Sequence, residues 1–188
     1  ARLMLLDAAW RYDQGDKSRE RASMAKLFAT RLCEYVSREQ PSLQYKTLIP
    51  CNLFGRHDKF NPAHSHLIAA VIHKIHQAHV NGLKEVDVWG DGFARREFML
   101  ASDLADAVWH MLDRFSDLPS LCNIGVGHDI SIHELAETVR EVTGYQGEIV
   151  FDRSKPDGTP RKLLDVSRLK ALGWQARVGL DEGLRATY

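Results

Sequence analysis

The sequence has few cysteines, and their spacing excludes a disulfide-based fold. Only three are present among the 188 residues, Cys33, Cys51 and Cys122, and no two form a C-x-x-C pair. An odd number of widely separated thiols fits a reducing compartment, so we expect a cytoplasmic protein.

The sequence also lacks an excess of charge of either sign. It has 25 Lys and Arg residues against 25 Asp and Glu residues, so no overall field favours nucleic acid, and any anion site must come from local clustering. No apolar run approaches the roughly 20 residues that span a bilayer, and the chain begins with a charged, helix-like segment rather than a signal peptide. We therefore expect neither a nucleic-acid nor a membrane partner.

Helical periodicity is present at the beginning of the chain. The pattern predicts one helix over Ala1–Gln14 and a second over Ser18–Gln40, with Ser18 or Asp16 as the N-cap between them. The second helix carries an apolar stripe at three- and four-residue spacing, made of Ala22, Ala25, Ala29, Leu32 and Val36. We expect residues 1–40 to form a helical hairpin.

Strands and helices alternate over residues 41–188. The predicted strands are 45–50, 85–89, 122–126 and 148–151, the first of them buried, and the predicted helices are 66–80, 104–115, 131–143 and 166–172. Ser102 or Asp103 is the candidate cap of the second helix, whereas Ser131 with Glu134 forms a capping box and Gly144 a stop for the third. This alternation and the 44% hydrophobic content predict an α/β lobe with its own core.

A cation-dense run follows the last predicted strand. It reads Lys155-Pro156-Asp157-Gly158-Thr159-Pro160-Arg161-Lys162-Leu163-Leu164-Asp165-Val166. Two prolines and a glycine favour turns, and three cations lie beside two carboxylates, so the loop suits a phosphate group. On composition alone, a solvated turn is the better interpretation.

Three further motifs change that balance. They are Asn52-Leu53-Phe54-Gly55-Arg56-His57-Asp58, then Ser65-His66, then Val88-Trp89-Gly90-Asp91-Gly92 followed by Arg95-Arg96-Glu97-Phe98. In this order, together with the cation-dense run, they resemble the GDP-L-fucose synthase family of extended short-chain dehydrogenases over about Leu32–Tyr188. The resemblance implies an α/β fold made of the substrate-binding lobe and the last Rossmann elements, preceded by the helical hairpin.

The resemblance also implies a reaction and a set of site residues. The family converts GDP-4-keto-6-deoxy-mannose to GDP-L-fucose by epimerising C3 and C5 and then reducing C4, with NADP as cofactor. His66 aligns with the family's catalytic acid, and Lys26 aligns with the lysine of its Tyr-x-x-x-Lys pair. The GDP-sugar is expected to contact Asn52, Leu53, Lys74, Trp89, Arg96, Lys155 and Arg161.

Several of these residues have ordinary structural interpretations as well. Lys74 is equally well explained as an exposed helix lysine, Trp89 as a core residue at a strand end, and Asn52 as a turn residue. Arg95 could bind the phosphate in place of Arg96.

The histidines suggest a metal site, but their spacing argues against one. His73, His76 and His79 recur in steps of three, which drift round a helix, and no H-E-x-x-H motif is present. We expect solvated histidines and no metal, with His57 and His64 as loop residues.

Part of the family's pattern is missing. Ala22 stands where the family has its catalytic Tyr, and the glycine-rich cofactor half and the catalytic Cys of the family have no counterpart. The segment Ala1–Arg31 resembles instead a helix pair of the acyl-CoA dehydrogenase C-terminal domain, which suggests a composite chain joined between Lys26 and Leu32. We therefore expect a chain that binds a GDP-sugar without turning it over.

An alternative hypothesis is a non-catalytic scaffold. The family dimerises through the helix of its Tyr-x-x-x-Lys pair, and the hairpin 1–40 offers apolar stripes for a similar homodimer. A third possibility is that the strand 45–50 is an exposed edge, which would make the chain prone to aggregation.

Overall fold

The chain divides into two units. The computed structural model describes residues 6–7, 10, 13–15, 19–61 and 64–188. One unit comprises Ala1–Leu48 with Leu118–Cys122, and the other comprises Ile49–Asp117 with Asn123–Tyr188. The first predicted helix and the candidate caps Asp16 and Ser18 lie largely outside the described residues, so the hairpin stays a prediction.

The smaller unit is built around the long helix α2, Arg19–Glu39, which matches the second predicted helix closely. Ala25 of the predicted stripe is 2% exposed. Leu32 of the same stripe is 39% exposed, and it belongs to a set of exposed large apolar side chains at positions three and four apart on α2: Met24, Leu27, Phe28, Leu32 and Tyr35. Helix α2 therefore presents a solvent-accessible apolar face.

The strands of the larger unit are short and mostly parallel. β2, Asn52–Phe54, pairs in parallel with β5, Phe98–Leu100, and β3, Glu85–Trp89, pairs in parallel with β8, Glu148–Asp152. β4, Arg95–Arg96, lies between antiparallel β7, Ile130–Ser131, and parallel β9, Arg161–Lys162. Strands β1, Thr47–Pro50, and β6, Leu121–Ile124, also pair, and each contains residues of both units. Parallel strands joined through helices confirm the predicted α/β fold.

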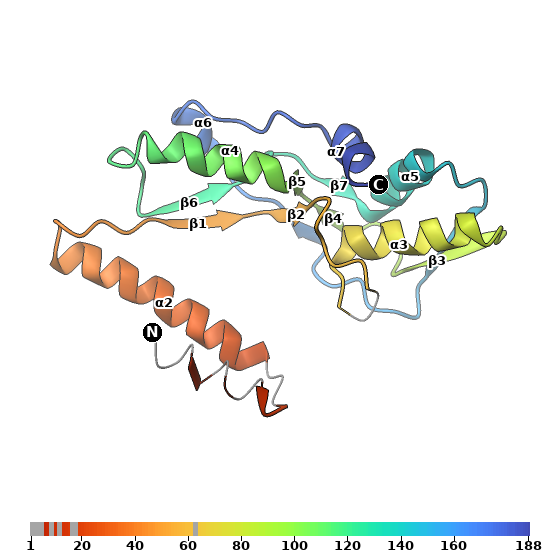
Figure 1. Cartoon of the computed structure of the whole chain (residues 1–188), viewed down its shortest axis with the longest axis horizontal. Coiled ribbons are helices and arrows are strands. Elements are labelled where there is room, and N and C mark those ends of the chain that lie inside the picture. The colour runs from red at the N-terminus through yellow and green to blue at the C-terminus, as the bar shows by residue number, and fades with distance from the viewer. Residues whose placement is uncertain (1–5, 8–9, 11–12, 16–18, 62–63) are drawn as a thin grey trace. The chain divides into compact units, whose positions relative to one another are not determined.

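Three helices pack around the core of the larger unit. They are α3, Leu67–Val80, α5, Ile132–Thr143, and α7, Leu180–Thr187, and Figure 1 shows them side by side. The helix predicted over residues 66–80 is confirmed as α3, and its buried side chains recur at helical spacing: Ile68, Ala69, Val71, Ile72, Ile75 and Ala78. Leu67, which the periodicity placed on the apolar face, is 38% exposed. α4, Ala101–Leu112, and α6, Ser167–Ala171, complete the set. Among the described helices, none is long and apolar enough to cross a membrane.

The predicted helix ends are right for α5 and wrong for α4. Ser131 and Glu134 form the capping box, and Gly144 ends α5 in the left-handed region, with φ 72°. α4 instead begins directly after β5, with Leu100 at the N-cap, so Ser102 and Asp103 lie inside the helix. The buried carboxylate of Asp103 accepts hydrogen bonds from the backbone N–H groups of residues 177 and 178, which is why it caps nothing.

Three further predictions need correction. The Asn52 motif begins with a strand, β2, which pairs with β5, and only its residues after Phe54 form a loop. The strand predicted as buried over residues 45–50 begins at Thr47, and its Ile49 is 38% exposed. The cation-dense run contains a strand, β9, because Arg161 and Lys162 pair with β4. Runs of two or three residues are too short for periodicity to identify.

Glu97 joins three segments of the larger unit from the junction of β4 and β5. Its side chain is buried, with the residue 1% exposed, and its carboxylate accepts hydrogen bonds from the N–H of Gly127 at 2.7 Å and of Leu164 at 3.0 Å. Its backbone oxygen accepts from the Asn52 side chain at 2.8 Å. A Cβ added at Gly125 would lie 2.2 Å from the Glu97 Oε1, so only glycine fits there. The carboxylate thereby fixes the loops on which the candidate site depends.

We predict that Glu97→Gln destabilises the fold. A glutamine of the same shape places an NH2 group against one of the two backbone N–H donors, which leaves a buried donor unsatisfied and costs about 2 kcal/mol. The measurement is the urea unfolding midpoint followed by circular dichroism, with exposed Glu148→Gln as the control. An unchanged midpoint for Glu97→Gln would contradict this role.

Candidate functional site

Side chains alternate between two faces of the extended backbone at residues 95–98, and the face that carries Arg96 lines a cavity. Arg96 and Phe98 line a cavity of about 410 Å³, whereas Arg95 and Glu97 bond to other parts of the larger unit. The other lining residues are Cys51, Asn52, Leu53, His66, Leu67 and Ile68. Four of the predicted site residues, Asn52, Leu53, His66 and Arg96, therefore surround one cavity.

Cys51 lies in the wall of this cavity but is not equipped to act as a base. Burial, with a further contribution from the negative charge of Glu97, raises the pKa of the Cys51 thiol to about 12. The nearby Lys162 ammonium lowers that pKa only in part. At neutral pH the thiol is therefore protonated and unreactive.

The Asn52 side chain is held by a hydrogen bond, whereas the His66 side chain is not held by a capping hydrogen bond. The side-chain amide of Asn52 donates to the Glu97 backbone oxygen, which holds Asn52 in place. His66 is exposed at the N-cap of α3, and its side chain makes no capping hydrogen bond. The imidazole of His66 is thus solvent-accessible at the cavity and is not held by a cap hydrogen bond.

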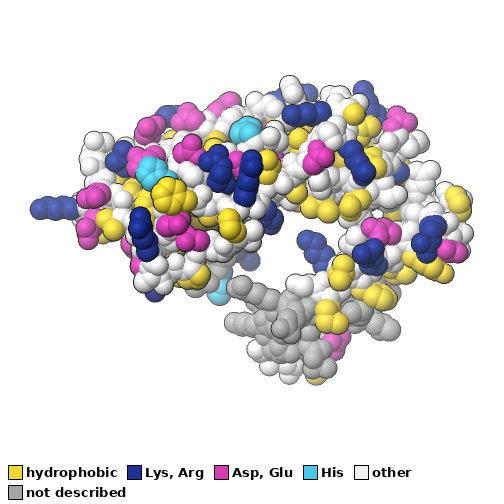
Figure 2. Space-filling model, turned by 180° about the vertical axis from the view of Figure 1, so that it is seen from behind, with side chains coloured by type: hydrophobic (Ala, Val, Ile, Leu, Met, Phe, Trp, Pro, Cys, Tyr) yellow, Lys and Arg dark blue, Asp and Glu magenta, His cyan; other side chains and the backbone are white. Residues whose placement is uncertain are grey.

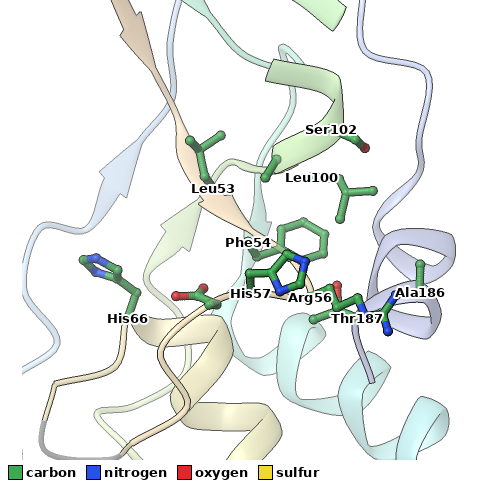
Figure 3. Close-up of a pocket in the computed structure, with 12 residues that line it drawn as sticks. Leu53, Phe54, Arg56, His57, His66, Leu100, Ser102, Ala186 and Thr187 are labelled. Carbon is green, nitrogen blue, oxygen red and sulfur yellow. The ribbon is translucent and has the colours of Figure 1, made fainter. Parts of the chain in front are cut away.

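A second cavity, of about 540 Å³, shares Leu53 and His66 with the first. Figure 3 shows Arg56, Ala186 and Thr187 grouped near the end of α7, with His66 apart from them at the start of α3. His57, which the sequence indicated as a loop residue, lines this cavity. The lining of the 540 Å³ cavity also includes the apolar side chains of Phe54 and Leu100.

Trp89 forms an exposed aromatic platform between two cations. Its ring is 61% exposed, so the interpretation of Trp89 as a core residue is wrong. The Nζ of Lys74 lies 5.6 Å from the ring centroid and the Nζ of Lys155 lies 5.7 Å from it. Lys74 also pairs with Asp87 at 2.5 Å. An exposed ring beside two ammonium groups suits a planar, electron-rich base with a phosphate nearby.

The loop of residues 153–160 closes against the turn that follows Trp89. The Asp157 carboxylate accepts from the backbone N–H of Asp91 at 2.7 Å. A Cβ added at Gly90, whose φ is +91°, would lie 2.0 Å from that Asp157 oxygen, so the contact needs glycine. At the other end of the loop, a Cβ on Gly158 would lie 3.6 Å from the Arg96 Nη2. The loop thus connects the Trp89 platform with the Arg96 cavity.

Four cations occupy two paired strands, and they divide into two pairs. Arg95 is in register with Arg161, and Arg96 with Lys162. Asp129 accepts from Arg95 Nε at 2.9 Å and from Arg161 Nε at 2.5 Å, and these bonds lower its pKa, the bond to Arg161 most. Among the described residues, neither Arg96 nor Lys162 forms an ion pair. Figure 2 shows basic and acidic side chains interspersed on the face that it draws, so this local pair matters more than any overall field.

The predicted site residues thus fall into separate groups. Lys74, Trp89 and Lys155 surround one ring, and Arg161 bonds to Asp129, so its contact with a phosphate stays a prediction. Lys26 is exposed on α2 in the other unit, and its role also stays a prediction.

The sequence pattern included Lys162 among the three cations of the cation-dense run but did not single it out as a contact of the GDP-sugar, and it gave Asp157 no role of its own. Only the strand register and the folding of the loop bring out their roles. Within the part of the chain that the structure describes, no group of three His, Cys, Asp or Glu residues could hold a metal ion.

Comparison with known proteins gives consistent matches. The model of the NAD dependent epimerase/dehydratase family matches residues 15–125, which begins upstream of Leu32, within the segment that resembles acyl-CoA dehydrogenases. The chain is similar to the GDP-L-colitose synthase of Yersinia pseudotuberculosis, with 45% identity over 92% of this chain and 56% of that protein. It is also similar to the GDP-L-fucose synthase of Escherichia coli K12, with 42% identity over 92% of this chain and 56% of that protein. The chain thus spans about half the length of the curated relatives it matches.

Solved structures agree with these relatives. A GDP-6-OMe-4-keto-L-xylo-heptose reductase from C. jejuni superposes with a TM-score of 0.80 and 30% identity, over 88% of this chain and 58% of that one. A GDP-L-fucose synthetase from Naegleria fowleri bound to NADP superposes with a TM-score of 0.75 and 27% identity, over 91% of this chain and 55% of that one.

We predict that Cys51 resists alkylation in the folded chain. With a pKa of about 12, the thiolate fraction at pH 8 is about 10⁻⁴. Iodoacetamide should therefore label half-buried Cys33 and leave Cys51 unmodified, as read by peptide mass spectrometry, and urea should abolish the difference. Equal labelling of the two thiols in the folded chain would refute the assigned pKa.

Proposed function

Because the chain belongs to the NAD dependent epimerase/dehydratase family, we propose that it is the GDP-sugar-binding portion of an NADP-dependent epimerase/reductase. The proposed reaction of the whole enzyme is conversion of GDP-4-keto-6-deoxy-mannose to GDP-L-fucose. Support comes from relatives named for GDP-L-fucose and GDP-L-colitose synthesis and from similar structures of proteins that act on GDP-linked sugars. That this chain by itself does not turn over the substrate stays a prediction, as does its cytoplasmic location.

The observation that carries the proposal is the pair of cations Arg96 and Lys162, neither of which forms an ion pair among the described residues, although Arg96 Nη1 donates to the Arg95 backbone oxygen at 2.8 Å. The two residues are register partners on β4 and β9, Arg96 lines the 410 Å³ cavity, and Lys162 acts on the thiol of Cys51 in the same cavity wall. Two neighbouring cations without an acidic partner among the described residues repel each other, and a diphosphate between them would remove that repulsion. A planar guanidinium beside an ammonium suits two adjacent phosphates.

The rest of the site fits a nucleotide with a sugar at its end. Trp89 would stack the guanine base, while Lys74 and Lys155 beside the ring would face its acceptor atoms and the phosphates. Asn52, Leu53 and His66 line the cavity beyond Arg96, where the sugar would lie. His66 would then act as the acid or base in exchanging protons beside the 4-keto group, and Lys26 would belong to the reduction step.

The described residues do not fit the pyrophosphate of NADP. A dinucleotide cradle needs a glycine-rich turn from a strand into a helix, with open backbone N–H groups. The Gly125–Gly127 turn follows β6 but leads to β7, and the space beside its glycines is filled by Glu97 and Val166. NADP use by the whole enzyme is therefore a proposal that rests on the family.

A second proposal concerns assembly. The exposed apolar face of α2, with Leu27 61% and Tyr35 53% exposed, is larger than isolated surface apolar residues explain. We propose that it pairs with the same face of a second copy, as an isologous helical contact. A chain that dimerises without binding a nucleotide would favour the scaffold alternative over the GDP-sugar site.

We expect the chain to bind GDP more tightly than UDP, and to lose binding when the platform or the cation is removed. Trp89→Ala should weaken GDP about tenfold, because base stacking on an aromatic side chain is lost. Arg96→Ala should weaken GDP at least tenfold, because a charge-assisted contact with phosphate is lost. Isothermal titration calorimetry measures both affinities.

The matched control is Trp109→Ala. Trp109 lies on α4, is 72% exposed and lines neither the 410 Å³ nor the 540 Å³ cavity. GDP affinity should be unchanged in this variant. The proposal fails if a folded chain gives no heat with GDP, or if Trp109→Ala weakens binding as much as Trp89→Ala does.

Leu27→Glu should convert a dimer into a monomer. A carboxylate in the middle of a buried helical interface is unpaired and desolvated, so the association constant should fall at least about a hundredfold. Light scattering after size-exclusion chromatography measures the mass, and Leu112→Glu is the control because Leu112 is similarly exposed on a different helix. A monomeric parent chain, or equal loss in the control, would count against dimerisation through α2.

A further inference from the structure

We propose that Asp129 is a positioning residue of the nucleotide site, which holds two cations on one face of β4 and β9 so that the other two remain free for phosphate. The inference rests on the proposed function and assigns a role to a residue that contacts neither cavity. Asp129 determines which two of the four neighbouring cations on β4 and β9 are neutralised and which two can bind phosphate.

The geometry of β4 and β9 places the four cations on two opposite faces of the strand pair. Side chains of register partners on neighbouring strands lie on the same face, and successive residues alternate between the two faces. Arg95 and Arg161 are register partners, and their guanidinium groups reach the same Asp129 carboxylate. Arg96 and Lys162 are the next pair and face the other way, so one strand pair presents two cations on each side.

The Asp129 side chain is buried, whereas its two arginine partners are partly exposed. The Asp129 side chain is 4% exposed, whereas the side chains of Arg95 and Arg161 are 41% and 62% exposed. The Asp129 backbone oxygen also accepts from Arg95 Nη2 at 2.8 Å, so Arg95 grips both the side chain and the main chain of this residue. The carboxylate therefore lies beneath two partly solvated guanidinium groups and neutralises charge at the point where the strands would otherwise repel.

No other acid takes over this task for Arg161. Glu134 lies 3.6 Å from Arg95 Nη1, but it is already engaged by the backbone N–H and hydroxyl of Ser131 in the capping box of α5. Among the described residues, the only ion pair of Arg161 is with Asp129. Loss of the Asp129 charge would thus leave Arg161 as an unneutralised cation directly opposite Arg95.

The consequence for the site follows from the position of β9. Arg161 and Lys162 are adjacent, and β9 follows the loop that contacts the Trp89 turn through Asp157. Repulsion at Arg161 would displace Lys162 from Arg96 and loosen the loop beside Trp89. The freed guanidinium would also offer a competing anion site on the wrong face.

The test is GDP calorimetry with Asp129→Asn, at about 50 mM and about 500 mM NaCl. At low salt we expect GDP affinity to fall about fivefold relative to the parent chain, because like charges face each other across β4 and β9. At high salt the parent chain should bind more weakly, and the difference between the two should shrink because screening relieves the repulsion. A purely structural role for Asp129 predicts a difference that salt does not narrow.

The second variant is Asp129→Asn combined with Arg161→Gln, which removes the like charge together with the acid. Its reference is Arg161→Gln alone, and we expect the GDP affinities of these two variants to agree within about twofold, because Asp129 then has no second guanidinium to neutralise. This variant carries the test by itself if Asp129→Asn alone does not fold, as judged by circular dichroism. Failure of the double variant to fold would show that Asp129 supports the core rather than the charge balance, and would overturn the inference.

Three results would count against Asp129. These are GDP affinity equal to or greater than that of the parent chain in Asp129→Asn, a difference insensitive to salt, or a double variant that binds at least about fivefold more weakly than Arg161→Gln alone. The last would mean that Asp129 acts on the site by a route other than Arg161. If the parent chain binds no GDP at all, the proposed function fails first, so the two failures are distinguishable.

Discussion

The candidate site depends on one buried carboxylate, that of Glu97. An ionised group inside a protein is expensive unless it is well solvated by fixed dipoles, and here two backbone N–H groups, of Gly127 and Leu164, serve that purpose. Each donor belongs to a different segment, and the Asn52 side chain adds a third through the Glu97 backbone oxygen. The cost of burying the charge is thus offset only when all these segments are in place. This makes the arrangement of the cavity wall cooperative with folding.

Residues 95–98 alternate between two roles, because successive side chains of an extended backbone lie on opposite faces. Arg95 and Glu97 hold neighbouring loops, through Asp129 and Gly127, while Arg96 and Phe98 line the cavity. Binding residues on such a segment are supported by their sequence neighbours, which face the opposite side. A free guanidinium can then be kept rigid without being neutralised, and that is what recognition of an anion requires.

Much of the fold could be predicted from the sequence, because helices α2, α3 and α5 are long and periodic, whereas the eight-residue α7 was not predicted. The α5 helix, with its capping box and glycine stop, carries all its signals within 14 residues of sequence, Ser131–Gly144. Strands β4, β7 and β9 contain two residues each, two of them made only of charged residues, so neither periodicity nor propensity could identify them. The α4 cap was misplaced because Asp103, a good cap by type, is used by a distant backbone segment. The candidate site, like the fold, could be predicted only in part. Its cations were visible in the sequence, but their separation into a neutralised and a free pair depends on strand register, which no local pattern encodes.

The contact between Gly90 and Asp157 makes two positions far apart in the chain depend on each other. A side chain at position 90 would occupy the space of the Asp157 carboxylate, and a smaller residue at 157 would leave the N–H of Asp91 without its acceptor. A substitution at either position is therefore expected to disturb the turn unless the other position changes with it. The turn beside Trp89 is thus constrained by shape in the way that core positions are, even though Trp89 itself is exposed.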